Sequence, residues 1–290
     1  MKTTQFRCLA VALVAVCAFG AQAQPARQFK DVTYAKVDGA PLALDVYMPA
    51  GVTAPPLVVW VHGGAWRSGT KAQAPMQFVE HGVAVASLDF RQSTDARFPA
   101  MIYDIKAAIR FLRANADKYG YRSERIAIAG NSSGGHLAAL VGVTNGKKEL
   151  EGTEGDDRSQ SSSVQAIVVY YGASDLTTIL KQSTPFGVNM REPALRLLLG
   201  DLPENSQALA RLASPVFHVD RTSPPLYLLH GDQDPQMPIN QAHELQGAYQ
   251  KLGLDATFDV VHGAAHGGDA FFASEHLTPV LAFLRRTIGR

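Results

Sequence analysis

Short apolar runs, rich in Val and Ile, recur along most of the chain. Most are continuous rather than alternating, as expected for strands that are covered on both faces. The first run, with residues 30–37 before it, alternates more and suits an antiparallel start to the sheet. The runs that predict strands are 42–47, 57–61, 83–88, 125–129, 166–171, 226–229 and 257–261.

Helical patterns lie between these runs. In residues 101–116, apolar side chains from Ile102 to Leu112 recur at three- and four-residue spacing, and Pro99 stands just before them. Strands that alternate with helices predict an α/β fold, with a mostly parallel central sheet of about eight strands and helices on both faces. The other predicted helices are 137–143, 240–252 and 277–288.

Two segments interrupt this alternation. Residues 145–163 are rich in Gly, Ser and charged residues, which predicts an exposed loop. Residues 176–213 contain three prolines and one apolar helical patch at 195–199. We expect this second segment to be a small insertion above the C-terminal strand ends. It is either a cap over a site or a peripheral excursion.

The first 23 residues have the pattern of a secretory signal. Lys2 and Arg7 precede an apolar run at 9–19, and Ala21 and Ala23 form a small-x-small cleavage site. The apolar run is shorter than the roughly 18 residues that a membrane span requires. We predict a signal peptide at 1–23 and periplasmic or secreted localisation, without membrane insertion after cleavage. An uncleaved anchor is the alternative.

Composition narrows the possible chemistry. Both cysteines, Cys8 and Cys17, lie in the predicted signal, so the mature chain would have no disulfide, thiol nucleophile or cysteine-zinc site. Removing Lys2 and Arg7 with the signal changes the formal net charge from +1 to −1. This net charge does not favour nucleic-acid binding, and no local cluster of Lys and Arg does so either. The sequence therefore predicts no nucleic-acid partner. With 46% hydrophobic residues, the chain has material for one large core.

The segment G-N-S-S-G at 130–134 lies between a predicted strand and a helical run. A nucleophilic serine on such a sharp strand-to-helix turn needs very small residues two positions before and two positions after it. Ser132 has Gly130 and Gly134 at these positions, whereas Ser133 has only one such glycine. Ser132 is therefore the predicted nucleophile.

A serine nucleophile needs a base, and the base needs an orienting acid. In this architecture the acid and then the base follow the serine along the chain. The next-to-last predicted strand is followed by Asp232 and Asp234, and the last by His262 and His266. We favour Asp234, which lies further out in its loop, and His266, which lies among small residues. The chain has nine histidines, so the position of His266 matters more than its residue type.

The segment H-G-G-A-W follows the second predicted strand. Glycines there let backbone N–H groups turn toward a reacting carbonyl, and a further N–H comes from the residue after the nucleophile, Ser133. Gly64 and Ala65 are the expected oxyanion-hole donors, while Gly63 shapes the turn or shares this role. Trp66 either lines a substrate pocket or packs in the core.

With these motifs in place, the chain resembles the α/β-hydrolase superfamily. Within it, the chain is similar to the esterase branch with an HGG-x-W loop, which is related to the hormone-sensitive-lipase group and to bacterial feruloyl and acetyl-xylan esterase-like domains. The likeness begins near Tyr34 and runs to the C-terminus. The matching segments are "SLDFR" at 87–91, "FPAMIYDIKAAIRFLRANA" at 98–116, "YGASDL" at 171–176 and "SPV" at 214–216.

The resemblance implies a catalytic domain over residues 24–290. It assigns Ser132, Asp234 and His266 as the triad, the same residues that the motifs indicate. Many members have a third glycine where this chain has Ala65, but alanine still has an N–H group to donate.

The resemblance also suggests structural roles for Asp89, Arg91 and Asp104, as an ion pair under the site rather than as substrate contacts. His136 and His262 lack the spacing of metal ligands, so we expect them to make local hydrogen bonds.

The combined interpretation is a serine carboxylic ester hydrolase that works through an acyl-enzyme, with no metal or other cofactor. We expect small-molecule or carbohydrate esters as substrates, either short-chain esters or carbohydrate- or aryl-linked esters. Arylformamidase or peptidase activity on the same fold is an alternative. So is a non-catalytic binding protein, although such proteins usually lack a triad member.

Overall fold

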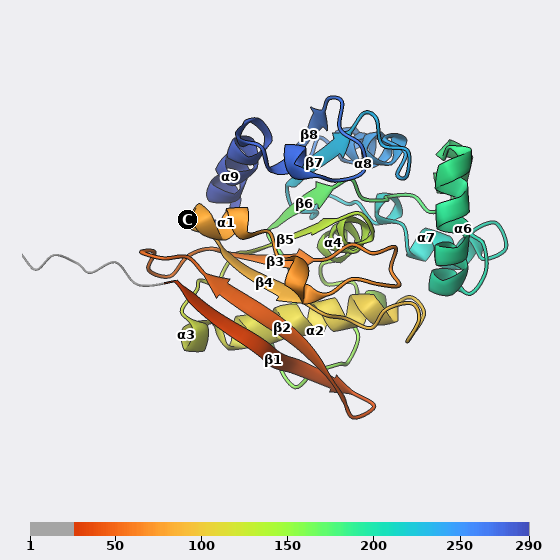
Figure 1. Ribbon diagram of the computed structural model, residues 1–290. Helices are drawn as coiled ribbons and strands as arrows, with labels where there is room; N and C mark the ends of the chain where they lie inside the picture. Colours follow the sequence, from red (N-terminus) through yellow and green to blue (C-terminus); the bar gives the residue numbers. More distant parts are fainter. Residues whose placement is uncertain (1–25, 290) are drawn as a thin grey trace, which may run out of the picture.

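The computed structural model describes residues 26–289. Their strands form one eight-stranded sheet in the order β1-β2-β4-β3-β5-β6-β7-β8 (Figure 1). The β1–β2 and β2–β4 pairs are antiparallel, and all other neighbours are parallel. This confirms the predicted mostly parallel sheet with an antiparallel start. The strands are β1 (Arg27–Val37), β2 (Ala40–Met48), β3 (Leu57–Val61), β4 (Ala84–Leu88), β5 (Ile126–Asn131), β6 (Ala166–Tyr170), β7 (Leu226–Gly231) and β8 (Ala256–Val261).

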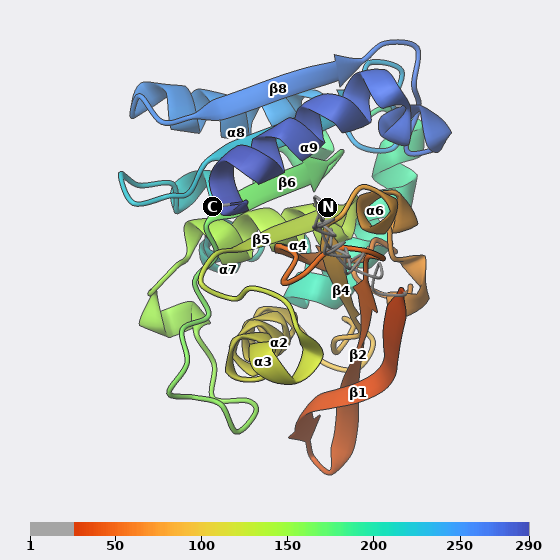
Figure 2. The ribbon, with the colours of Figure 1, turned by 90° about the vertical axis from the view of Figure 1, so that its left-hand side faces the viewer.

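Helices cover both faces of this sheet (Figure 2). Alternate side chains of a strand point to opposite faces, and β3 shows the result. Its Val59 and Val61 pack in a core shared with α2, α4 and α8, whereas Val58 and Trp60 pack in a core shared with α1 and α9. The helices are α1 (Met76–Glu80), α2 (Ala100–Ala114), α3 (Ala116–Tyr119), α4 (Ser133–Val143), α5 (Ile179–Gln182), α6 (Pro185–Leu199), α7 (Gln207–Leu212), α8 (Asn240–Lys251) and α9 (Ser274–Ile288).

The predicted signal peptide at 1–23 lies outside the described residues and stays a prediction. Within residues 26–289, no helix has both the length and the apolar character that crossing a membrane requires.

Residues 145–163 are mostly irregular and, apart from the buried Leu150 and Ser162, exposed or half-buried, which largely confirms the predicted exposed loop. Glu151 accepts hydrogen bonds from Lys106 and Arg110, two buried cations on α2. Glu154 accepts one from Arg91. The charge in this loop therefore neutralises buried cations as well as facing water.

The predicted insertion at 176–213 contains α5, α6 and α7. Leu195 and Leu198 of α6 are fully buried in the same core as α2, α4 and α8. Figure 1 shows α6 on the side toward which the arrow of β6 points, and the insertion therefore packs against the body of the fold near the C-terminal strand ends.

Candidate active site

Ser132 lies on the turn between β5 and α4. Its backbone has φ 53° and ψ −123°, and a positive φ is uncommon for a residue with a side chain. Its N–H donates to Tyr170 O at 2.9 Å, and its C=O accepts from His136 N at 3.1 Å. Hydrogen bonds to β6 and to the first turn of α4 thus hold the strained turn in place.

The two flanking glycines are required by close backbone contacts. A Cβ on Gly130 would lie 2.4 Å from Gly134 O, and a Cβ on Gly134 would lie 2.1 Å from Val61 O. Backbone atoms cannot move aside as a flexible side chain can. The sequence argument from small flanking residues therefore has a direct steric basis, and it applies to Ser132.

Three of the predicted residues form one hydrogen-bonded row. The Oγ of Ser132 lies 2.8 Å from Nε2 of His266, and Nδ1 of His266 lies 2.6 Å from Oδ2 of Asp234. The three come from the loops after β5, β7 and β8, at the C-terminal edge of the sheet. The distances allow a proton to pass from the hydroxyl to the imidazole while the carboxylate orients the ring.

The Asp234 carboxylate is almost fully enclosed, with 1% of its side chain exposed. Its Oδ1 accepts the backbone N–H groups of Gln236 and Met237, each at 2.8 Å. Burial would raise the pKa of Asp234, but contacts with His230 and His266 outweigh burial and hold this pKa well below its usual range. Asp234 is therefore ionised at neutral pH.

The two residues that were not favoured, Asp232 and His262, pair with each other. Nδ1 of His262 lies 2.8 Å from Oδ2 of Asp232, and 83% of the histidine side chain is exposed. This second pair runs beside the first on the same two loops, but it contacts no serine hydroxyl. His262 thus makes the local hydrogen bond that we expected of it.

The predicted oxyanion loop turns sharply after β3. Gly64 has φ 124°, and a Cβ there would lie 2.0 Å from Ser68 O. Ala65 and Trp66 also have positive φ, 54° and 60°. Consecutive positive φ values make this loop a tight turn, the kind of backbone in which anion-binding concavities form.

Of the three candidate donors in this loop, Gly63 is already engaged. Its N–H donates to Oδ1 of Asn131 at 2.9 Å, which suits a turn-shaping role. Within the described chain, the N–H groups of Gly64, Ala65 and Ser133 have no acceptor. Ser133 is the first residue of α4, where unpaired N–H groups and the helix dipole both favour negative charge.

Trp66 is buried, and its Nε1 donates to Nδ1 of His136 at 3.0 Å. The Nε2 of His136 donates to Ala213 O at 2.7 Å, which ties the site loop to the end of the insertion. Burial lowers the pKa of His136 to about 4, against the opposing effect of this hydrogen bond, so the imidazole is neutral. Among the described residues, no three His, Cys, Asp or Glu side chains are grouped as metal ligands.

The expected ion pair is present, with one correction. Arg91 binds the buried Asp104 with two nitrogens, Nη2 to Oδ1 at 2.7 Å and Nε to Oδ2 at 2.9 Å. Asp89 takes no part in it and instead accepts the backbone N–H of Lys71 at 2.7 Å.

Ser132 lines two cavities. An open cleft of about 360 Å³ is lined by Gly64, Arg67 and Tyr171, among others. A small pocket of about 40 Å³ is lined by Trp66, Ser133 and residues of α6. His266 lines both cavities, so an ester at Ser132 could extend one part into each.

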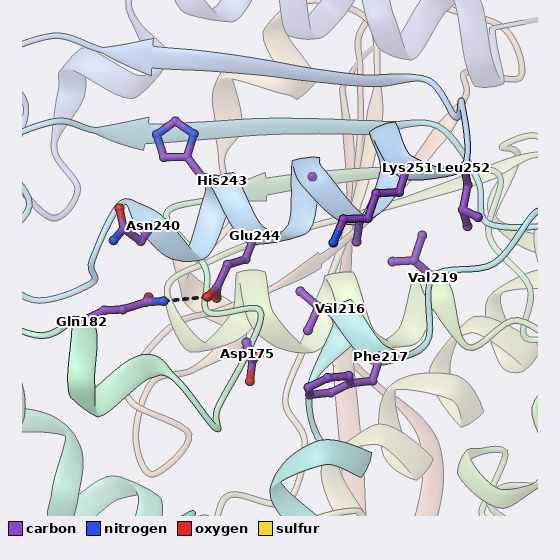
Figure 3. Close-up of a pocket in the computed structure, with 12 residues that line it drawn as sticks. Asp175, Gln182, Val216, Phe217, Val219, Asn240, His243, Glu244, Lys251 and Leu252 are labelled. Atoms are coloured by element: carbon purple, nitrogen blue, oxygen red, sulfur yellow. Dashed lines mark hydrogen bonds between the residues drawn. The ribbon is translucent and has the colours of Figure 1, made fainter.

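A larger cavity of about 730 Å³ lies elsewhere, beside α8 and the turn η3 (Pro215–Phe217) (Figure 3). Glu244 in its wall accepts hydrogen bonds from Gln182 at 2.6 Å and Thr178 at 3.0 Å. Neither Ser132 nor His266 lines it. Cavity volume alone would therefore not have identified the site at Ser132, Asp234 and His266.

Sequence reasoning missed two residues of the site. Asn131 connects three loops, because its Oδ1 accepts from Gly63 while its Nδ2 lies 3.4 Å from the hydroxyl of Tyr171. Arg191 of α6 lines the small pocket. Asn131 stands at a variable position of the serine motif and Arg191 in a segment without a motif, so neither carried a local signal.

Comparisons with known proteins identify the family of this chain. The BD-FAE family model matches residues 44–249. Esterase LipC of Mycobacterium tuberculosis is 33% identical over 232 residues, which are 74% of this chain and 56% of LipC. The chain spans about half the length of the curated relatives that it matches first.

The chain also resembles solved structures, and it covers a larger share of the length of two of them than of the curated relatives. A truncated carbohydrate esterase from gut microbiota has a TM-score of 0.83 and 32% identity, with 91% of this chain and 97% of that chain covered. The propionate-bound esterase Est2 of Thermogutta terrifontis has a TM-score of 0.70 and 28% identity, with coverage of 88% and 92%. The protein thus belongs to the BD-FAE family, an esterase family with the α/β-hydrolase fold.

Proposed function

We propose that this protein is a serine carboxylic ester hydrolase. The observation that carries the proposal is the row from Ser132 Oγ through His266 to Asp234, with distances of 2.8 and 2.6 Å. The esterase relatives support the same reaction class.

In the proposed reaction, His266 takes the proton of Ser132 as its Oγ attacks the ester carbonyl. Asp234 stabilises the imidazolium that forms. The N–H groups of Gly64, Ala65 and Ser133 bind the oxyanion, and each such donor is typically worth about 3–4 kcal/mol in the transition state. His266 then protonates the leaving alcohol, and water releases the acid from the acyl-enzyme by the same route.

The two cavities suggest how the substrate lies. We assign the acyl group, which stays on Ser132 after the alcohol has left, to the small pocket and the alcohol to the open cleft. Short acyl groups fit the pocket, and the cleft has room for a sugar or an aryl alcohol. In this arrangement α6 acts as a cap, because Met190 lines both cavities.

The test is hydrolysis of p-nitrophenyl acetate. Ser132→Ala is expected to lower kcat by about 10⁶, the loss seen when the serine or the histidine of a triad is removed. Ser133→Ala keeps the backbone N–H and should retain at least a tenth of the wild-type kcat/KM. Equal activity of wild type and Ser132→Ala would exclude Ser132 as the nucleophile.

A panel of substrates then distinguishes the possible classes of ester substrate. Acetyl-xylan, methyl ferulate and p-nitrophenyl esters of increasing chain length differ in their alcohol and acyl parts. A wild-type protein that hydrolyses none of these esters would support the non-catalytic interpretation.

A further inference from the structure

An arginine is buried beside Ser132 without an anionic partner. Arg191 of α6 is 6% exposed and, within residues 26–289, forms no salt bridge, whereas Arg196 on the same helix pairs with Asp201. Its Nη1 lies 3.4 Å from Gly187 O and its Nη2 3.4 Å from the sulfur of Met237. Its Nε is buried and has no acceptor among the described residues.

These contacts do not offset the burial of a cation. The contact with Gly187 O lies beyond the usual length of an N–H···O hydrogen bond, and the sulfur of Met237 is a weak acceptor. A buried charge is costly unless it is paired and hydrogen-bonded. Burial lowers the pKa of Arg191 to about 10 against the nearby charge of Asp234, so the guanidinium is still protonated at neutral pH. It can therefore donate charge-assisted hydrogen bonds to an acceptor that enters.

The position of Arg191 defines where that acceptor would lie. Arg191 lines the small pocket of about 40 Å³ together with Ser132, His266 and Met237. A cavity needs about 10–15 Å³ to hold one water molecule, so this pocket admits a group of only a few heavy atoms. The acceptor must then be a short distance from the scissile carbonyl, on the acyl side.

We propose that Arg191 binds a carboxylate carried by the acyl group, so that half-esters of short dicarboxylic acids are the preferred substrates. The planar guanidinium matches a carboxylate through two parallel hydrogen bonds. This inference rests on the proposed ester hydrolysis and adds the chemical class of the acyl group.

The test compares two substrates of nearly equal shape, monomethyl succinate and methyl succinamate, by pH-stat titration of the acid released. Wild-type kcat/KM is expected to be at least tenfold higher for the half-ester, the size of one charge-assisted hydrogen bond. In Arg191→Met this ratio should fall to about 1. Because both substrates are measured on one sample, the ratio does not depend on the folded fraction. A wild-type ratio near 1 overturns the proposal.

Two control variants locate the effect. Arg196→Met removes a positive charge from the same helix outside the pocket, and the ratio should stay at its wild-type value. Arg67 lines the open cleft. If Arg67→Met, and not Arg191→Met, collapses the ratio, the carboxylate binds in the cleft and the assignment to Arg191 is wrong.

A second measurement needs no variant and so covers the case in which Arg191→Met does not fold. Succinate should inhibit wild-type hydrolysis of p-nitrophenyl acetate with a Ki at least tenfold below that of butanoate, and equal Ki values contradict the proposal. A protein that hydrolyses p-nitrophenyl acetate without half-ester preference refutes only this inference. A protein that hydrolyses neither class of ester refutes the proposed function itself.

Discussion

At the scale of single residues, the position of Ser132 depends on neighbours that have no side chain. Gly134→Ala would place a Cβ 2.1 Å from Val61 O, between two backbone segments that cannot separate locally. We expect the free energy of unfolding to fall by about 3 kcal/mol or more, or the protein not to fold. Urea denaturation measures the change.

Gly247→Ala is the matched control for this prediction. Gly247 lies inside α8, and a Cβ there meets nothing within 4 Å. Alanine is the better helix former, so this change should stabilise the protein by roughly 0.5–1 kcal/mol. If the two variants were equally stable, close packing at the turn would not be the reason for Gly134.

The two parallel Asp–His pairs allow a second prediction. Asp234→Asn should lower kcat on p-nitrophenyl acetate by about 10⁴, because the amide cannot stabilise the imidazolium and favours the wrong tautomer of His266. Asp232→Asn disturbs only the exposed pair with His262 and should change kcat less than twofold. Similar losses in both variants would contradict the choice of Asp234.

Single residues also show where sequence reasoning stops. Ser132, Asp234 and His266 could be proposed because a motif and a chain order constrain them. Asn131 could not be proposed in this way. Its partner Gly63 is 68 positions away, and no sequence pattern near either residue predicts the contact. Arg191 was missed for a related reason, because only the folded chain reveals that a cation is buried without a carboxylate.

At the scale of elements, strands were easier to predict than helices. Strands covered on both faces appear as continuous apolar runs, and β3 has the predicted bounds. By contrast, α1, α5 and α7 have only four to six residues, too few to show a helical period. In α6, Pro193 interrupts the pattern, so only residues 195–199 of its 15 residues were recognised.

The cations on α2 lead to a prediction for this helix. Glu151→Ala leaves Lys106 and Arg110 buried without their carboxylate. Breaking a buried pair typically costs about 3–5 kcal/mol, and since Glu151 is about a third exposed we expect about 2–3 kcal/mol. Urea denaturation against Glu149→Ala, which removes an exposed carboxylate from the same loop, measures this. A loss below 0.5 kcal/mol, within the range of ordinary surface substitutions, would contradict the prediction.

At the scale of the whole molecule, His136 makes stability depend on pH. Its pKa is about 4 when folded and near 6.5 when unfolded. Above pH 6.5 the imidazole is unprotonated in both the folded and the unfolded state, so its contribution to the free energy of unfolding is constant. Between 6.5 and 4 the unfolded state binds it and the folded state does not, so stability falls as the pH falls.

The expected loss from His136 is about 2–3 kcal/mol between about pH 7 and about pH 4.5. Urea denaturation at both pH values measures it. His136→Gln can keep one donor and one acceptor but does not titrate, so its stability should fall less over the same interval. Equal pH dependence in both proteins would show that His136 does not cause the loss.

Ser132, Asp234 and His266 come from three separate loops, and this has a consequence for refolding. Ser132 and His266 are 134 positions apart, and the turn that carries Ser132 is held by β6. The site therefore cannot assemble before β5, β6, β7 and β8 are in register. During refolding, hydrolytic activity should therefore return no faster than the slowest of these strand pairings forms. The rate at which activity returns then reports when the sheet is complete.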